Sequence, residues 1–113
     1  MPFKIHNTAL DLEEGPFPLS DWNPPSHGAI YGILMKRENS EYRLIYIGQS
    51  ENLSELVFKK LREYPCWLRE AGDLSNLYIA YHYMPSALQE QRIAIMHDLI
   101  RLGDPICNRS PVR

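Results

Sequence analysis

Two neighbouring runs of β-forming residues decide the fold, AIYGILM at residues 29–35 and YRLIYIG at residues 42–48. Isoleucine and tyrosine, which favour strands, recur in both runs. The break between them, at residues 36–41, is charged and contains Asn39-Ser40. Two short β-rich runs with a polar break between them are typical of an antiparallel hairpin. The sequence therefore predicts a β-hairpin over residues 29–48.

Downstream of the hairpin, the sequence predicts two helices with a third strand between them. Apolar residues recur at helical spacing over residues 53–64, and Pro65 ends that helix. Residues 77–84 (LYIAYHYM) are rich in tyrosine and indicate a strand. Ser86 begins a capping-box pattern that opens a helix running to about Leu102. The β-β-α-β-α order predicts a small α/β (α+β) domain whose mostly antiparallel, three-stranded sheet has flanking helices.

Upstream of the hairpin, residues 1–26 have a different composition. Five of the nine prolines fall in the first 25 residues, and proline removes a backbone donor and restrains the residue before it. Residues 1–24 hold four acidic groups and one basic group, a net charge of −3. We interpret residues 1–26 as an irregular, proline-rich, acidic arm that lies over the domain. The domain itself spans residues 27–109, and residues 110–113 form a tail.

Length and composition limit the class of protein. A chain of 113 residues with 44% hydrophobic residues has room for one small core. No apolar run approaches the roughly 20 residues that a membrane span needs, and the N-terminus does not have the pattern of a secretory signal. We therefore expect a cytoplasmic protein that does not associate with membranes. The formal charge of −2 also argues against binding to nucleic acid by bulk electrostatics alone.

The sequence gives no indication of a metal or disulfide framework. Cys66 and Cys107 lie 41 residues apart, and two cysteines in a cytoplasmic chain are expected to be reduced and buried. The histidines show no metal-ligand spacing, and no Cys-x-x-Cys occurs. We expect no resident cofactor.

Several short motifs, taken together, resemble the GIY-YIG nuclease family. Tyr31 lies in the first β-run, and the second ends in Tyr46-Ile47-Gly48, followed by Asn52-Leu53. The end of the chain carries Leu99-Ile100 and then Pro105-Ile106-Cys107-Asn108. The resemblance covers about residues 27–109. The first motif departs from the family because it has Ala29 where the family has glycine.

The resemblance implies phosphodiester cleavage at a site built from the two motif strands. In the family, a tyrosine activates the attacking water, an arginine on the first helix steadies the phosphate, and a glutamate on the last long helix binds a divalent metal. A terminal asparagine orders the site. Tyr31, Tyr46 and Asn108 match the two tyrosines and the asparagine. Gly48 ends the second motif strand and permits close approach of the backbone.

Two charged groups of the family pattern are replaced by apolar residues. The arginine position is Leu56, and the glutamate position is Met96. A thioether is a soft ligand that does not hold Mg²⁺, and Asp98 and Glu90 lie on other faces of the predicted helix. Loss of the metal-binding carboxylate should reduce the rate by roughly three or more orders of magnitude. We expect Met96 to face the tyrosines or the core just beneath them.

A basic group near the lost arginine offers a replacement for it. Lys59, Lys60 and Arg62 follow Leu56 within two turns, and Lys60 at i+4 would reach a shared phosphate if the segment is helical. The same three residues form an ordinary solvated helix face in the simpler interpretation.

These observations leave three hypotheses. The first is a degenerate nuclease-fold domain without catalysis that binds a protein, a second copy of itself or, weakly, a nucleic acid. The second is an active Mg²⁺-dependent endonuclease that keeps Tyr31, Tyr46 and Asn108 and recruits Lys60 or Arg62. The third is a chance match in an unrelated α/β domain, which separation of the two motif strands would establish.

Overall fold

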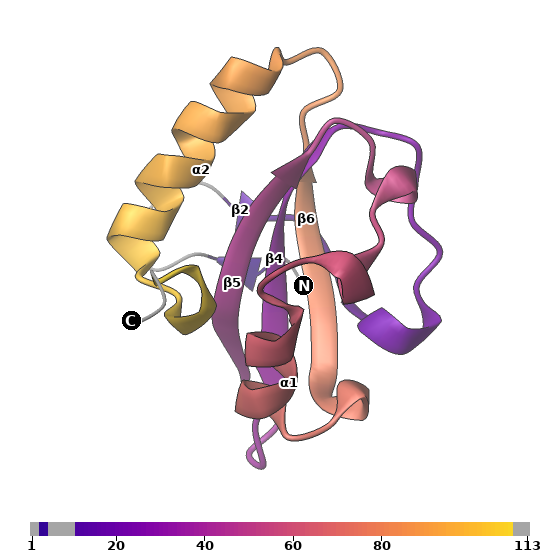
Figure 1. Cartoon of the computed structure of the whole chain (residues 1–113), viewed down its shortest axis with the longest axis vertical. Coiled ribbons are helices and arrows are strands. Elements are labelled where there is room, and N and C mark those ends of the chain that lie inside the picture. The colour runs from indigo at the N-terminus through magenta and orange to yellow at the C-terminus, as the bar shows by residue number, and fades with distance from the viewer. Residues whose placement is uncertain (1–2, 5–10, 110–113) are drawn as a thin grey trace.

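The computed structural model describes residues 3–4 and 11–109. A four-stranded antiparallel sheet with the strand order β3-β6-β4-β5 lies at its centre (Figure 1). Its strands are β3 (Glu14–Pro18), β4 (Ala29–Lys36), β5 (Tyr42–Ser50) and β6 (Leu77–Tyr83). The helices α1 (Tyr64–Ala71) and α2 (Gln89–Gly103) flank this sheet. The predicted α+β class is confirmed, but the sheet has four strands instead of three.

Short 3₁₀ helices connect the main elements. In the described residues they are η1 (Leu19–Asp21), η2 (Leu53–Glu55), η3 (Phe58–Lys60), η4 (Leu74–Asn76) and η5 (Ile106–Asn108). A small two-stranded sheet pairs β1 (Phe3–Lys4) with β2 (Asp11–Leu12). None of the described helices is both long enough and apolar enough to cross a bilayer.

The predicted hairpin is confirmed as β4 and β5, which pair directly. Tyr31 lies opposite Gly48, and Gly32 lies opposite Ile47. The two motif strands are therefore neighbours, so the test that would have established a chance match is not met. β6 pairs with the other side of β4, which makes β4 a central strand and explains why six of its residues are buried.

The fourth strand comes from the proline-rich arm. Residues 14–18 form β3 and pair with β6, so this part of the arm is regular rather than irregular. Pro16 and Pro18 lie in this edge strand, where a missing amide is tolerated and discourages further pairing. The part of the arm at residues 5–10 and the predicted tail at 110–113 lie outside the described residues.

The predicted helix over residues 53–64 is wrong. Asn52 accepts a hydrogen bond from the Ser54 amide at 3.0 Å and begins the short turn η2, and the backbone is extended at Leu56 and Leu61. The apolar residues of this segment reach the core through two turns instead of one helix face. Pro65 lies in the first turn of α1 instead of ending a helix, a position where its missing amide costs no hydrogen bond.

The strand and helix predicted after residue 76 are confirmed, with a shifted helix start. β6 covers Leu77–Tyr83, and α2 begins at Gln89 instead of Ser86. The Gln91 side chain accepts a hydrogen bond from the Leu88 amide at 2.8 Å, so the cap forms two residues later than the sequence pattern predicts.

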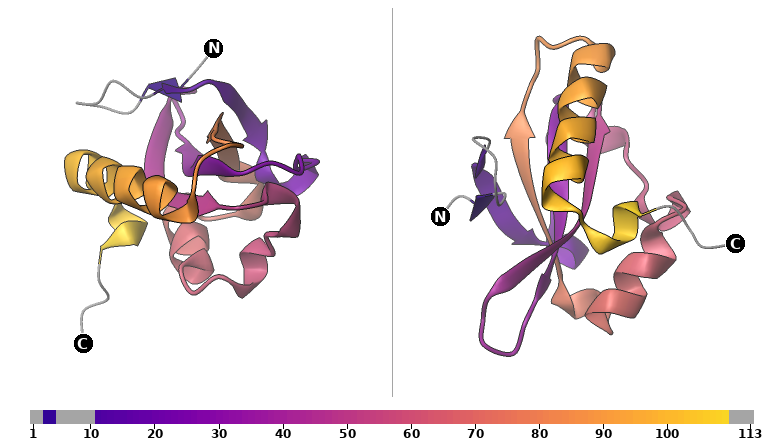
Figure 2. Two further views of the ribbon diagram at one scale, coloured as in Figure 1. Left: turned by 90° about the horizontal axis from the view of Figure 1, so that it is seen from above. Right: turned by 90° about the vertical axis from the view of Figure 1, so that its left-hand side faces the viewer.

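The sheet is buried on both faces, by different elements (Figure 2). On one face, Tyr31 and Ile33 of β4 pack with Trp67 of α1. On the other face, Ile30 of β4 packs with Leu99 of α2. The side chains of Tyr31 and Tyr46 therefore pack on one face of the sheet, and α2, the helix that carries Met96, lies over the opposite face.

The expectation of two unpaired thiols is wrong. Cys66 in α1 and Cys107 in η5 form a disulfide with their Cα atoms 5.8 Å apart, a separation that suits the bond. The chain between them, a sequence separation of 41 residues, includes β6 and α2, which return the chain to the side of α1. Sequence separation alone gives no sign of this approach.

Candidate functional site: the tyrosine pair

The structure brings the two motif tyrosines together on one face of the sheet. Tyr31 of β4 and Tyr46 of β5 have ring centroids 6.1 Å apart. The pair is possible because Gly48 has no side chain. A Cβ atom at that position would lie 2.5 Å from both Cζ and Oη of Tyr31. The prediction that Gly48 ends the strand is wrong, because β5 continues to Ser50. The close approach that Gly48 permits is that of a tyrosine ring of the same chain.

Aromatic rings cover the tyrosine pair. Phe58 of η3 meets Tyr31 edge-on, with centroids 6.0 Å apart, and Trp22 meets Phe58 at 5.9 Å. Trp67 lies 5.1 Å from Tyr46. As a result Tyr31 is only 2% exposed. Sequence analysis missed Phe58, Trp22 and Trp67 as neighbours, since they come from three separate segments and no motif links them.

The environment holds both phenols in their neutral form. Burial, reinforced by the neighbouring Tyr46, raises the pKa of Tyr31 far above its usual range. Burial and then the Glu63 carboxylate raise the pKa of Tyr46 to about 12. A general base works best with a pKa near the working pH. Both pKa values are raised away from neutral pH instead of lowered towards it, so neither tyrosine is prepared to accept a proton at neutral pH.

Glu63 is the acidic group that sequence analysis did not place here. It precedes α1, and its carboxylate acts on the pKa of both tyrosines. Its Oε2 atom lies 3.6 Å from Nε of Arg62. The predicted helix over residues 53–64 placed Glu63 inside a helix. A helix predicted to start at residue 64 would have placed Glu63 directly before it, as the structure does.

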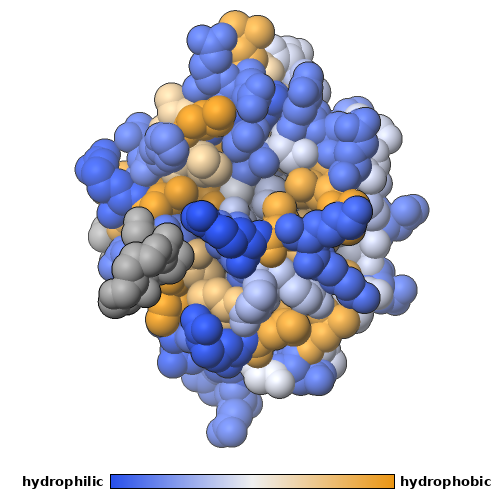
Figure 3. All heavy atoms as spheres, in the orientation of Figure 1, coloured by the Kyte–Doolittle hydropathy of each residue, from blue (hydrophilic) through white to orange (hydrophobic). Residues whose placement is uncertain are grey.

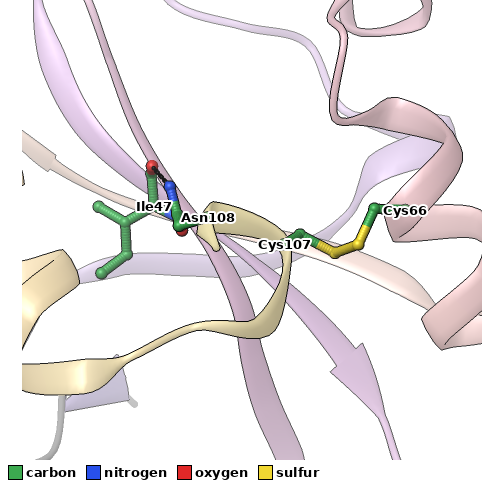
Figure 4. The surroundings of a disulfide bond; sticks show 4 residues. All are labelled: Ile47, Cys66, Cys107 and Asn108. Carbon is green, nitrogen blue, oxygen red and sulfur yellow. Dashed lines mark hydrogen bonds between the residues drawn. A yellow bond between two sulfur atoms is a disulfide. The ribbon is translucent and has the colours of Figure 1, made fainter. Parts of the chain in front are cut away.

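Asn108 orders the strand that carries Tyr46 (Figure 4). The Ile47 amide donates to Asn108 Oδ1 at 2.7 Å, and Asn108 Nδ2 donates to the Ile47 carbonyl at 2.8 Å. The side chain therefore replaces a neighbouring strand at the edge of the sheet. It binds backbone, so its role here is structural.

The positions that the resemblance assigns to the arginine and the glutamate lie on opposite faces of the sheet. Leu56 packs against the core cluster that contains Tyr31, whereas Met96 is half-buried against the cluster that contains Ile30 and Leu99. Met96 therefore packs in the apolar cluster on the opposite face of the sheet and does not face the tyrosine rings. Asp98 is exposed and pairs with Arg101 at 3.5 Å, and Glu90 is exposed. Within the described residues, no three His, Cys, Asp or Glu side chains are grouped to hold a metal ion.

Of the predicted basic group, only Arg62 acts on the pKa of a motif tyrosine, and against the larger effects of burial and Glu63 it lowers that of Tyr46 slightly. Lys59 and Lys60 end η3 and are exposed, and Arg62 is exposed beyond it. Because residues 56–60 do not form an α-helix, Lys60 does not stand one helical turn from Leu56. The geometry that made Lys60 a replacement for the arginine is absent.

A mainly apolar groove lies beside the covered site. Its volume is about 360 Å³. Its lining comes from η1, the 56–59 segment, α1 and η4: Leu19, Ser20, Leu56, Val57, Phe58, Lys59, Tyr64 and Leu74. Lys59 is the one charged lining residue, and Val57 is 52% exposed. Apolar patches alternate with hydrophilic side chains on the face that carries α1 (Figure 3).

Arg92 is a buried cation that sequence reasoning did not single out. It is 2% exposed on α2. Its Nε donates to Gln49 Oε1 at 3.1 Å, and its Nη1 donates to the Ala87 carbonyl at 2.8 Å. Both acceptors are neutral, and no carboxylate of the described residues pairs with it. Arg92 thus ties the end of β5 to the turn before α2.

Comparison with known proteins adds no relative to this description. No model of a known protein family matches the chain, and no curated protein matches it either.

Proposed function

We propose that the chain is a degenerate GIY-YIG-like domain that does not cleave phosphodiesters and instead binds another protein. The observation that carries this proposal is the burial of Tyr31 beneath Phe58, with Leu56 packed into the same cluster. In a working nuclease that cluster would have to admit a phosphate and a water molecule.

The chemistry of the cluster argues against hydrolysis. Cleavage of a phosphodiester depends on positioned charges around the phosphate oxygens. Tyr31 is surrounded by aromatic and aliphatic side chains, with the half-buried Tyr46 beside it, and the raised pKa of Tyr46, about 12, keeps its proton in place. These features favour a packed core over a cavity that binds an anion.

The surface argues for a protein partner. A mainly apolar groove with one lysine suits side chains of another protein better than a phosphate backbone. The formal charge of −2 agrees with this choice. A second copy of the chain is included among such partners. We place the protein in the cytoplasm and assign it no cofactor.

A second candidate function, an active endonuclease, rests on Glu63. This carboxylate lies close enough to raise the pKa of Tyr46, and Arg62 lies beside it. Tyr46 as the base, Glu63 as the acidic group and Arg62 as the cation would then lie together at one end of the covered cluster. This candidate needs Mg²⁺ and an opening of the aromatic cover, and it predicts that both Tyr46 and Glu63 are essential.

The deciding experiment is nicking of supercoiled plasmid in Mg²⁺ or Mn²⁺. Wild type is compared with Tyr46→Phe, and Tyr42→Phe on the same strand is the matched control because its ring packs on Tyr78. The proposal expects no nicking above background from any of them. Nicking by wild type and Tyr42→Phe, abolished by Tyr46→Phe and Glu63→Gln, would replace it with the endonuclease. Separately, tight duplex binding that weakens steeply with salt would make the partner a nucleic acid.

A further inference from the structure

The open edge of β5 is closed at one point by a side chain. An edge strand offers unpaired amide and carbonyl groups that can pair with another extended chain. At Ile47 both groups are taken by Asn108, at 2.7 and 2.8 Å. The Ile47 position is thus protected only while the turn that carries Asn108 stays in place.

Packing and one covalent bond hold that turn. Pro105 and Cys107 are buried, and Ile106 packs against the core cluster that contains Tyr31. η5 is three residues long, and the ion pair between Arg109 and Asp104 that follows it is exposed, where such pairs contribute little. The covalent tie is the disulfide from Cys107, the residue directly before Asn108, to Cys66 of α1 (Figure 4). The disulfide is therefore the covalent restraint that acts, together with this packing, on the position of the group that covers the sheet edge.

We propose that the Cys66–Cys107 disulfide is a redox-controlled latch that holds Asn108 on the edge of β5. In the oxidised protein the edge is closed at Ile47. Reduction releases η5 from α1, so Asn108 leaves more readily and the amide and carbonyl of Ile47 become free to pair with an extended chain. A disulfide in a cytoplasmic protein is usually transient or redox-sensing. The latch nevertheless stands on the geometry and does not depend on the proposed function.

The opening step is thiol–disulfide exchange with a dithiol reductant. A thiolate of the reductant attacks Sγ of Cys66, which is half-buried, whereas Cys107 is 4% exposed. The Cys107 sulfur leaves as a thiolate and takes a proton. The second thiol of the reductant then attacks the mixed disulfide and releases Cys66, which is also protonated. Two electrons pass to the protein disulfide, and the reductant ends as a cyclic disulfide.

The test is amide hydrogen exchange of the full chain, with and without dithiothreitol, followed residue by residue. Reduction should speed exchange at Ile47 about tenfold, as expected for loss of one hydrogen bond, and leave the amides of the central strand β6 unchanged. Cys66→Ser should exchange like the reduced protein under both conditions. Asn108→Ala should speed exchange at Ile47 while the disulfide stays intact.

Three outcomes would overturn the latch. The first is unchanged exchange at Ile47 on reduction. The second is equal acceleration at Ile47 and throughout β6, which would make the disulfide a general stabiliser. The third is a thiol count of two free cysteines after treatment with oxidised glutathione, because the bond would then not form.

Discussion

Replacing Gly48 with alanine should place a methyl group against the ring of Tyr31. The new Cβ would lie 2.5 Å from Cζ and 2.9 Å from Cε1 of that ring. Carbon atoms pack best at about 3.5–4.0 Å, so the ring or the strand must move by about 1 Å. Tyr31 is 2% exposed and meets Phe58 and Tyr46, so it has nowhere to rotate.

The expected cost follows from two opposing effects. Overpacking a buried position costs about 1–3 kcal/mol, and alanine regains about 0.5–1 kcal/mol over glycine inside a strand. We expect Gly48→Ala to lower the free energy of unfolding by about 1–2 kcal/mol, taking the overpacking cost as the larger effect. Urea unfolding should show a lower midpoint with an unchanged slope.

Gly32→Ala is the matched control, because Gly32 lies on the neighbouring strand. Its new Cβ would approach Cδ1 of Leu12 at 2.7 Å and Cδ1 of Leu44 at 2.8 Å. Both atoms are at the ends of flexible side chains that can turn aside, so the loss should be smaller. A Gly48→Ala protein as stable as wild type, or more stable than Gly32→Ala, would refute the close contact between the glycine and the ring.

Three further predictions concern Tyr46 and Arg92. Because Tyr46 titrates at about 12 in the fold and near 10 when unfolded, it contributes stability that is present below about pH 10 and is lost as the pH rises towards about 12. In Tyr46→Phe the urea midpoint should fall less between about pH 10 and pH 12 than it does in wild type. An equal fall of the midpoint with pH in both proteins would contradict the prediction. Glu63→Gln should lower the pKa of Tyr46, seen as earlier tyrosinate absorbance. An identical titration would show that the carboxylate does not act on the ring. Arg92→Ala should lower the free energy of unfolding by about 1–2 kcal/mol, because it removes two part-buried hydrogen bonds, and a thermal melt within error of wild type would disprove this.

The hairpin and the tyrosine pair could be predicted because their signals are local. Alternating β-formers fix β4 and β5, and strand pairing then places Tyr31 opposite Gly48 without further information. Strand β6 and helix α2 were predictable for the same reason. Residues 53–64 misled the prediction because apolar spacing at i, i+3 and i+4 also suits a chain of short turns, and Asn52 begins one of them.

Other features depend on approach between segments far apart in sequence. Nothing local predicts that residues 14–18 add an edge strand to β6, or that Trp22 reaches Phe58. The disulfide depends on where η5 turns after α2. No sequence pattern singles out Arg92, whose buried position depends on the turn before α2 that brings the Ala87 carbonyl to its guanidinium.

The family-like motif around Tyr46 and Gly48 can persist without any catalysis. Gly48 is required by the ring of Tyr31, and Asn108 is required by the backbone of Ile47. Each of these residues therefore has a packing or hydrogen-bonding reason to remain. Leu56 and Met96, in contrast, stand at the positions to which the resemblance assigns charged groups, and both join apolar clusters. Under the proposed function, the residues that shape the sheet remain and those that would carry charge are apolar, which is the pattern expected of a fold that no longer performs the reaction.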